Sequence, residues 1–185
     1  MRINSYISIG IGSLLFYFCI LNFVCAAPKV KEYHIKARYI DGFISFIQWP
    51  VDTLTSESPI KLCILGDNPF GKTLEILANK HNGEGSHASH RRIISYLQRG
   101  EDITHCHLLY ISVSEESYVQ QVLTQVQGKP ILTVSSLKNF AVEGGMIEFY
   151  VRDNKIRFLI APKKLRNAKL QPDANLLRVA DLVTD

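Results

Sequence analysis

The fold class is decided by one stretch of sequence, KLCILGDNPFGKTLEIL, residues 61–77. Together with Ile60, its first residues form an apolar run that suits a strand ending at Leu65. Glycine, asparagine and proline then mark a turn at Gly66–Gly71, and apolar residues return at helical spacing after Thr73. The stretch therefore predicts a strand, a turn and a helix in succession.

The same alternation continues along the chain. Further strands are expected at 92–96, 107–112 and 131–134, and helices at 31–48, 115–127 and 173–182. Strands that alternate with helices of this length form βαβ units with a largely parallel sheet. The segment 144–161 predicts two strands joined by a turn at Asp153–Asn154. We expect an α/β three-layer sandwich, mostly parallel, with a C-terminal antiparallel hairpin at the edge.

The helix expected at residues 31–48 carries two apolar stripes. One stripe holds Tyr33, Ala37, Ile40, Ile44 and Ile47, and the neighbouring stripe holds Ile35, Tyr39, Phe43 and Phe46. A helix that is apolar over half its circumference is usually buried on two sides. Either the whole helix lies in the core, or one stripe packs on a second subunit.

The N-terminus predicts export. Arg2 precedes an almost wholly apolar run over residues 6–24, and Val24 and Ala26 stand where a signal peptidase reads small residues. We expect a signal peptide at 1–26, cleaved after Ala26, and a single periplasmic domain at 27–185. An uncleaved anchor fits less well because glycines dilute the run, and a lipoprotein site at Cys25 would want a smaller residue than Val24.

Residues 66–73 match the phosphate-binding pattern G-x-x-x-x-G-K-[ST]. Such a loop points backbone N–H groups at the phosphates, but Pro69 has no N–H and Asp67 adds negative charge. An exported protein also meets no maintained ATP or GTP pool. We therefore interpret the match as a strand-to-helix junction with Pro69 early in the helix, and we expect no nucleotide and no other cofactor to bind.

Two cysteines, Cys63 and Cys106, remain after processing, and an even pair in an exported protein indicates a disulfide. Neighbouring strands are about 4.8 Å apart, close to the Cα separation that a disulfide accepts. Left unpaired, Cys106 beside His105 would be a candidate thiol nucleophile.

The histidines at 87, 90, 105 and 107 could each bind a metal. The sequence has no CxxC or HExxH motif of the kind that forms a closed zinc site. We interpret them as solvated loop histidines and expect no metal. The formal net charge of +4 falls to +3 when Arg2 is removed with the signal peptide, which is too small to indicate nucleic acid. No nucleophile motif such as G-x-S-x-G is present, so the sequence gives no sign of an enzyme.

Several segments together resemble the YfiR family. They are EYHIKARYIDGFISFIQWP (32–50), KLCILGDNPFGKTLEIL (61–77), CHLLYIS (106–112), PILTVSSLKNFAVEGGMIEFYVRDNKIRFLIA (130–161) and NLLRVA (175–180). The resemblance covers nearly the whole mature chain. It implies a periplasmic, dimeric repressor that binds the periplasmic part of an inner-membrane diguanylate cyclase and so lowers cyclic-di-GMP and biofilm formation.

The resemblance also bears on single residues. Cys63 and Cys106 match positions that family members can bridge, whereas the second cysteine pair of some members is absent near Gly144–Gly145. Family members commonly have an asparagine at the position where this chain has Ala161–Pro162.

Two other functions remain as alternatives. A periplasmic small-ligand binding module would have its site near Trp49, Asp67 and Asn68, although Trp49 also suits a packing role. The other alternative is a thiol oxidoreductase, which would need two closely spaced cysteines in a CxxC motif.

Overall fold

The computed structural model describes residues 27–55, 58–83 and 90–183, with side chains from residue 31 onward. The expected signal peptide at 1–26 lies outside the described residues. The main sheet has seven strands in the order β3-β2-β4-β5-β6-β7-β9. The strands are β2 (Ile60–Leu65), β3 (Arg92–Leu97), β4 (Leu108–Ile111), β5 (Leu132–Ser135), β6 (Ile147–Arg152), β7 (Lys155–Ile160) and β9 (Asp181–Leu182).

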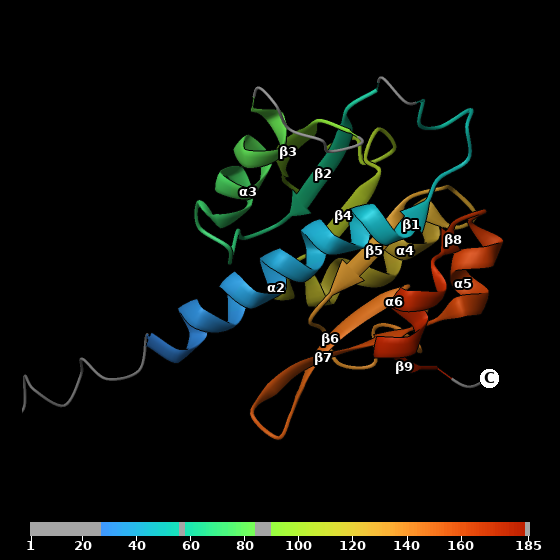
Figure 1. Cartoon of the computed structure of the whole chain (residues 1–185). Helices are drawn as coiled ribbons and strands as arrows, with labels where there is room; N and C mark the ends of the chain where they lie inside the picture. The colour runs from blue at the N-terminus through green and yellow to red at the C-terminus, as the bar shows by residue number, and fades with distance from the viewer. Residues whose placement is uncertain (1–26, 56–57, 84–89, 184–185) are drawn as a thin grey trace, which may run out of the picture.

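Helices cover both faces of this sheet. Figure 1 shows α2 (Ala27–Phe46) crossing the front and α4 (Val119–Val126) behind. The remaining helices are α3 (Thr73–Asn82), the 3-10 helix η1 (Val113–Tyr118), α5 (Pro162–Asn167) and α6 (Ala174–Val179). A small antiparallel sheet pairs β1 (Ile47–Gln48) with β8 (Gln171–Pro172). All neighbours in the main sheet are parallel except β6 and β7, which confirms the expected α/β class.

The side-chain alternation of β2 divides the apolar interior into two cores. Successive residues of a strand point to opposite faces. Leu62 and Ile64 therefore join the core under α2, whereas Cys63 and Leu65 join the core under α4. Burying each leucine or isoleucine stabilises the fold by about 1.5–3 kcal/mol relative to exposure. Both neighbours of β2 are parallel strands, and helices cover both faces of a parallel sheet. Both faces of β2 must therefore be apolar, as the sequence shows.

Helix α2 buries one of its two stripes and leaves most of the other exposed. Ala37 and Ile40 are fully buried on the sheet, and Phe43 packs between Phe149 and Phe158 with ring centroids 5.8 and 5.1 Å away. The rest of the second stripe is exposed: Ile35 by 39%, Tyr39 by 36% and Phe46 by 42%. Of the two arrangements expected for this helix, full burial within the chain is wrong.

The hairpin forms where the sequence predicted it. Asp153 and Asn154 take positive φ angles of 52° and 55°, as a two-residue hairpin turn requires, and β6 and β7 pair over their full length. The structure adds β9, which pairs with β7 through Leu159 and Ile160. Along the outer side of β7, residues 155–158 pair with no strand of the described chain.

The C-terminal region contains elements that the sequence did not predict. Helix α5 starts with Pro162 at its first turn and buries Leu165, but six residues are too few to show a helical period. The last helix is shorter than expected and ends at Val179. The expected helix at 115–127 is divided into η1 and α4.

Cys63 and Cys106 form a disulfide that ties β2 to the loop before β4, with their Cα atoms 5.9 Å apart. Both residues are buried in the core under α4, at 0% and 3% exposure. The bond closes a loop of 43 residues, so it should stabilise the fold mainly by restricting the unfolded chain.

Replacing Cys63 or Cys106 with alanine should lower the free energy of unfolding by about 4 kcal/mol, the loop-closure value for this separation. The double variant should be little worse than either single variant, because both remove the same bond. Urea unfolding of oxidised protein measures this effect. Equal stability of the wild type with and without reductant would contradict the assignment.

Candidate functional site

The turn after β2, where the phosphate-loop pattern falls, is filled by the protein itself. Gly66 has φ +85°, and a Cβ there would lie 2.5 Å from Ser114 Oγ and 2.7 Å from Glu115 Cγ. Glu115 is buried, and its carboxylate pairs with Arg99 Nε at 2.5 Å. Ser114 and Glu115 therefore fill the space beside Gly66 that a phosphate would need.

Two backbone N–H groups of the turn are also occupied. Asp67 N–H donates to Ser114 Oγ at 3.0 Å, and Phe70 N–H donates to Asn68 Oδ1 at 2.9 Å. Phe70 is buried against Tyr110, with ring centroids 4.7 Å apart. Pro69 lies in the turn, before α3 begins at Thr73, rather than early in the helix as expected. Asp67 and Asn68 therefore shape a closed junction.

Mg-ATP and Mg-GTP should give no heat of binding in titration calorimetry, because Ser114 and Glu115 fill the space beside Gly66 and two N–H groups of the turn are already paired. Lys72→Ala should leave this result and the melting temperature unchanged, since Lys72 is exposed. Micromolar binding that is lost in Lys72→Ala would show that the turn opens to a nucleotide.

The three residues expected at a ligand site do not meet. Trp49 lines a cavity together with Ile60, the first residue of β2. Asp67 and Asn68 follow Leu65, the last residue of the same strand. The structure therefore places Trp49 and the Asp67–Asn68 pair at opposite ends of β2.

One cluster in the described part of the chain consists of residues whose side chains can bind metals. The sulfurs of Cys63 and Cys106 and a ring nitrogen of His105 lie within 4.8 Å of one another. Zinc binds thiolates, and these two sulfurs are joined in the disulfide. While the bond is intact, the cluster offers one free ligand, an exposed histidine. His87 lies outside the described residues.

His107 has a structural role, and the expectation that it is a solvated loop residue is wrong. Its Nδ1 accepts the Lys61 N–H at 3.0 Å, so its Nε2 carries the proton that faces Thr53 O at 3.3 Å. The ring links the segment before β2 to the start of β4. Burial of the ring lowers the pKa of His107 below its usual value. His90 is also half-buried, with Nδ1 3.1 Å from Ser58 O.

The lowered pKa of His107 should make the fold sensitive to acid. The unfolded chain protonates this ring near pH 6.5, whereas the folded chain resists protonation. Stability should be complete above that pH and fall as the pH decreases through it towards the folded-state value. Urea midpoints measured at several pH values should fall less steeply in His107→Gln than in the wild type. Parallel profiles would contradict this assignment.

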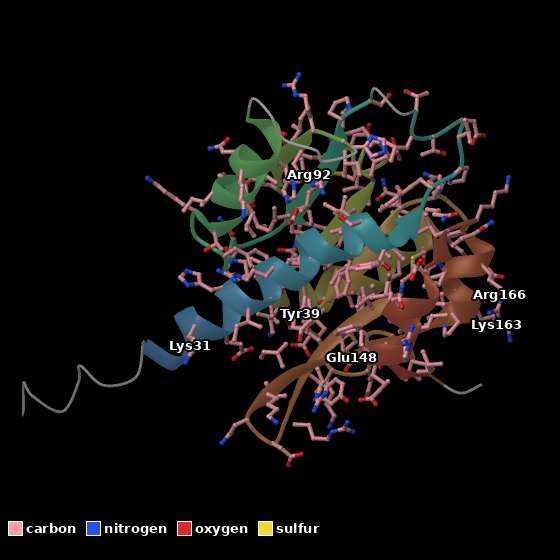
Figure 2. All side chains as sticks on the ribbon, in the orientation of Figure 1. Lys31, Tyr39, Arg92, Glu148, Lys163 and Arg166 are labelled. Carbon is pink, nitrogen blue, oxygen red and sulfur yellow. A yellow bond between two sulfur atoms is a disulfide. The ribbon has the colours of Figure 1, made fainter. Side chains whose placement is uncertain are left out.

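An exposed groove of the described chain lies between α2 and the hairpin. We call it the α2–hairpin groove. Its floor is apolar and its rim is charged, and its lining comprises Lys31, Glu32, Ile35, Tyr39, Val151, Asn154, Lys155, Ile156 and Arg157. Figure 2 shows Lys31 and Tyr39 on α2, along the side that faces the hairpin. The groove has a volume of about 780 Å³.

Packing beneath the groove holds Tyr39 in place. Its ring lies 5.4 Å from the ring of Phe158 and 6.1 Å from that of Phe149. The stripe pattern of α2 had identified Ile35 and Tyr39. It could not identify Val151 and Ile156, whose position beside α2 depends on how the sheet is ordered.

These features define an α/β domain with a closed strand-to-helix junction after β2, a bridged core and an exposed groove between α2 and the hairpin. The sequence model of the YfiR/HmsC-like family matches residues 33–181, and the chain belongs to that family. The family is regulatory rather than catalytic, is periplasmic, and is associated with diguanylate cyclase signalling. None of the described helices has the length and apolar character needed to cross a membrane.

Proposed function

We propose that this protein is a periplasmic repressor that binds the periplasmic part of an inner-membrane diguanylate cyclase. By holding the cyclase inactive, it would lower cyclic-di-GMP and biofilm formation. Membership of the YfiR/HmsC-like family supports this role, and the predicted signal peptide would place the protein in the required compartment. The single structural observation that carries the proposal is the exposed α2–hairpin groove.

The groove suits a protein partner because its apolar floor remains accessible. Ile35 and Tyr39 are more than a third exposed, and Val151 is 54% exposed. Apolar surface gathered in one place on a folded domain is typical of an interaction site. The open outer edge of β7 runs along the same groove, so an extended segment of a partner could add to the sheet there.

The charges at the rim favour an acidic partner. Lys31, Lys155 and Arg157 line the groove, and the one carboxylate among its lining residues, Glu32, is already paired with Lys36 at 2.5 Å. A two-fold contact between two copies through this groove would bring the basic groups together, which is unfavourable. We therefore assign the groove to the cyclase and propose that the homodimer uses another surface.

A second candidate function is a periplasmic small-ligand binding module. The cavity beside Trp49 favours it. The two functions are compatible, because the cavity and the groove have no lining residue in common.

Deleting the gene should raise cellular cyclic-di-GMP in a strain that expresses the partner cyclase. The full chain should restore the low level, and a copy lacking residues 1–26 should not, because it would stay on the wrong side of the membrane. Ile35→Glu should also fail to restore it, since a carboxylate in the apolar floor would weaken binding about 10-fold or more.

The matched control for this experiment is Ile76→Glu, which places the same charge on α3 at a position that is 67% exposed. Ile76→Glu should repress normally, and both variants should reach the same periplasmic abundance. An unchanged cyclic-di-GMP level in the deletion strain would refute the regulatory role. Full repression by Ile35→Glu would refute the assignment of the groove.

A further inference from the structure

A second hollow lies where the end of α2 meets the first residues of β2 and β3. It has a volume of about 500 Å³, within the range of small-molecule sites. Its apolar wall includes Ile44, Ile47, Leu54 and Ile60. Three of these side chains belong to the core under α2, and the fourth, Leu54, packs against it, so the wall is firmly held.

The opposite wall carries a fixed arginine. Arg92 is only 5% exposed, and its Nε donates to Asp41 Oδ1 at 3.3 Å while its Nη1 donates to His90 O. The Asn82 side chain bonds both backbone groups of Arg92, at 2.8 and 2.9 Å. Figure 2 shows Arg92 in the region of α3 and the end of α2. This guanidinium is therefore positioned before any ligand arrives.

The carboxylate in this cluster is already satisfied. Asp41 accepts from Arg92 through Oδ1 and lies 2.8 Å from His81 Nε2 through Oδ2. His81, His90 and Arg92 all line the hollow. Arg92 carries five N–H donors, so an incoming ligand would meet those that Asp41 and His90 O do not use, while the one acid nearby is engaged elsewhere.

The indole of Trp49 adds an unpaired donor. Its Nε1 is buried and has no hydrogen-bond partner among the described residues. A buried N–H without an acceptor is costly, so native proteins seldom leave one unpaired. An acceptor supplied by a ligand in the hollow would satisfy it.

We infer that this hollow binds a small organic carboxylate: the carboxylate oxygens would accept from Trp49 Nε1 and Arg92, and an apolar body would pack on Ile44, Ile47 and Ile60. Donors on one wall and aliphatic side chains on the other match the two halves of such a molecule. The inference does not depend on the regulatory role, because it concerns a different surface.

Trp49 is the single tryptophan of the chain, so its fluorescence reports on the hollow directly. The exported protein, residues 27–185, should be titrated with benzoate and phenylacetate and with their neutral amides, benzamide and phenylacetamide. At least one carboxylate should change the emission saturably, with an affinity about 10-fold or more above that of its amide. No saturable change with either carboxylate, or equal binding of the amides, would overturn the inference.

Two variants test the residues by calorimetry with the carboxylate that binds more tightly. Trp49→Phe keeps an aromatic ring but removes the donor, and it should weaken binding about 10-fold. Ser45→Phe, at an exposed lining position, should block entry while leaving every donor in place. Tyr118→Phe, which removes a hydroxyl far from the hollow, should bind as the wild type does. Unchanged affinity in both Trp49→Phe and Ser45→Phe would place the ligand elsewhere.

Discussion

The packing of α2 across the sheet is the constraint on which the rest of the structure depends. The helix has more apolar surface than one sheet face can cover, so Ala37, Ile40 and Phe43 are buried while Ile35 and Tyr39 stay accessible. Beyond its end, β1 pairs with β8, and Asp173 N–H donates to Phe46 O at 2.8 Å, which fixes the C-terminal region against it. Both the α2–hairpin groove and the hollow beside Trp49 exist because α2 is held in this position.

The same packing explains why the usual ligand position of an open α/β sheet is closed. Ligands of such sheets lie beyond the carboxyl ends of the strands, where the strand order reverses. Here that position lies between β2 and β4, and Ser114 and Glu115 fill it up to Gly66. The accessible surfaces lie elsewhere, along the hairpin and at the amino ends of β2 and β3.

Much of the fold followed from the sequence, because apolar periodicity and turn residues are local signals. β2 was predicted residue for residue, and the Asp153–Asn154 turn has the backbone it requires. The short elements α5, β8 and β9 carry too few residues to show a period. The site was less predictable: a stripe pattern identifies the faces of α2 but cannot say which face the sheet will cover. Likewise, only the three-dimensional fold shows that Trp49 and Asp67 lie at opposite ends of one strand.

The most direct test of regulation through the groove is hydrogen–deuterium exchange on the exported protein, alone and with the purified periplasmic part of the cyclase. If the groove is the contact, those amides of residues 155–158 that point away from β6, on the open edge of β7, should become protected, together with those of the adjoining part of α2. Amides of α3, on the far side of α2 from the hairpin, should exchange as before. Unchanged exchange along β7 and α2 in a complex that demonstrably forms would contradict the assignment of this surface.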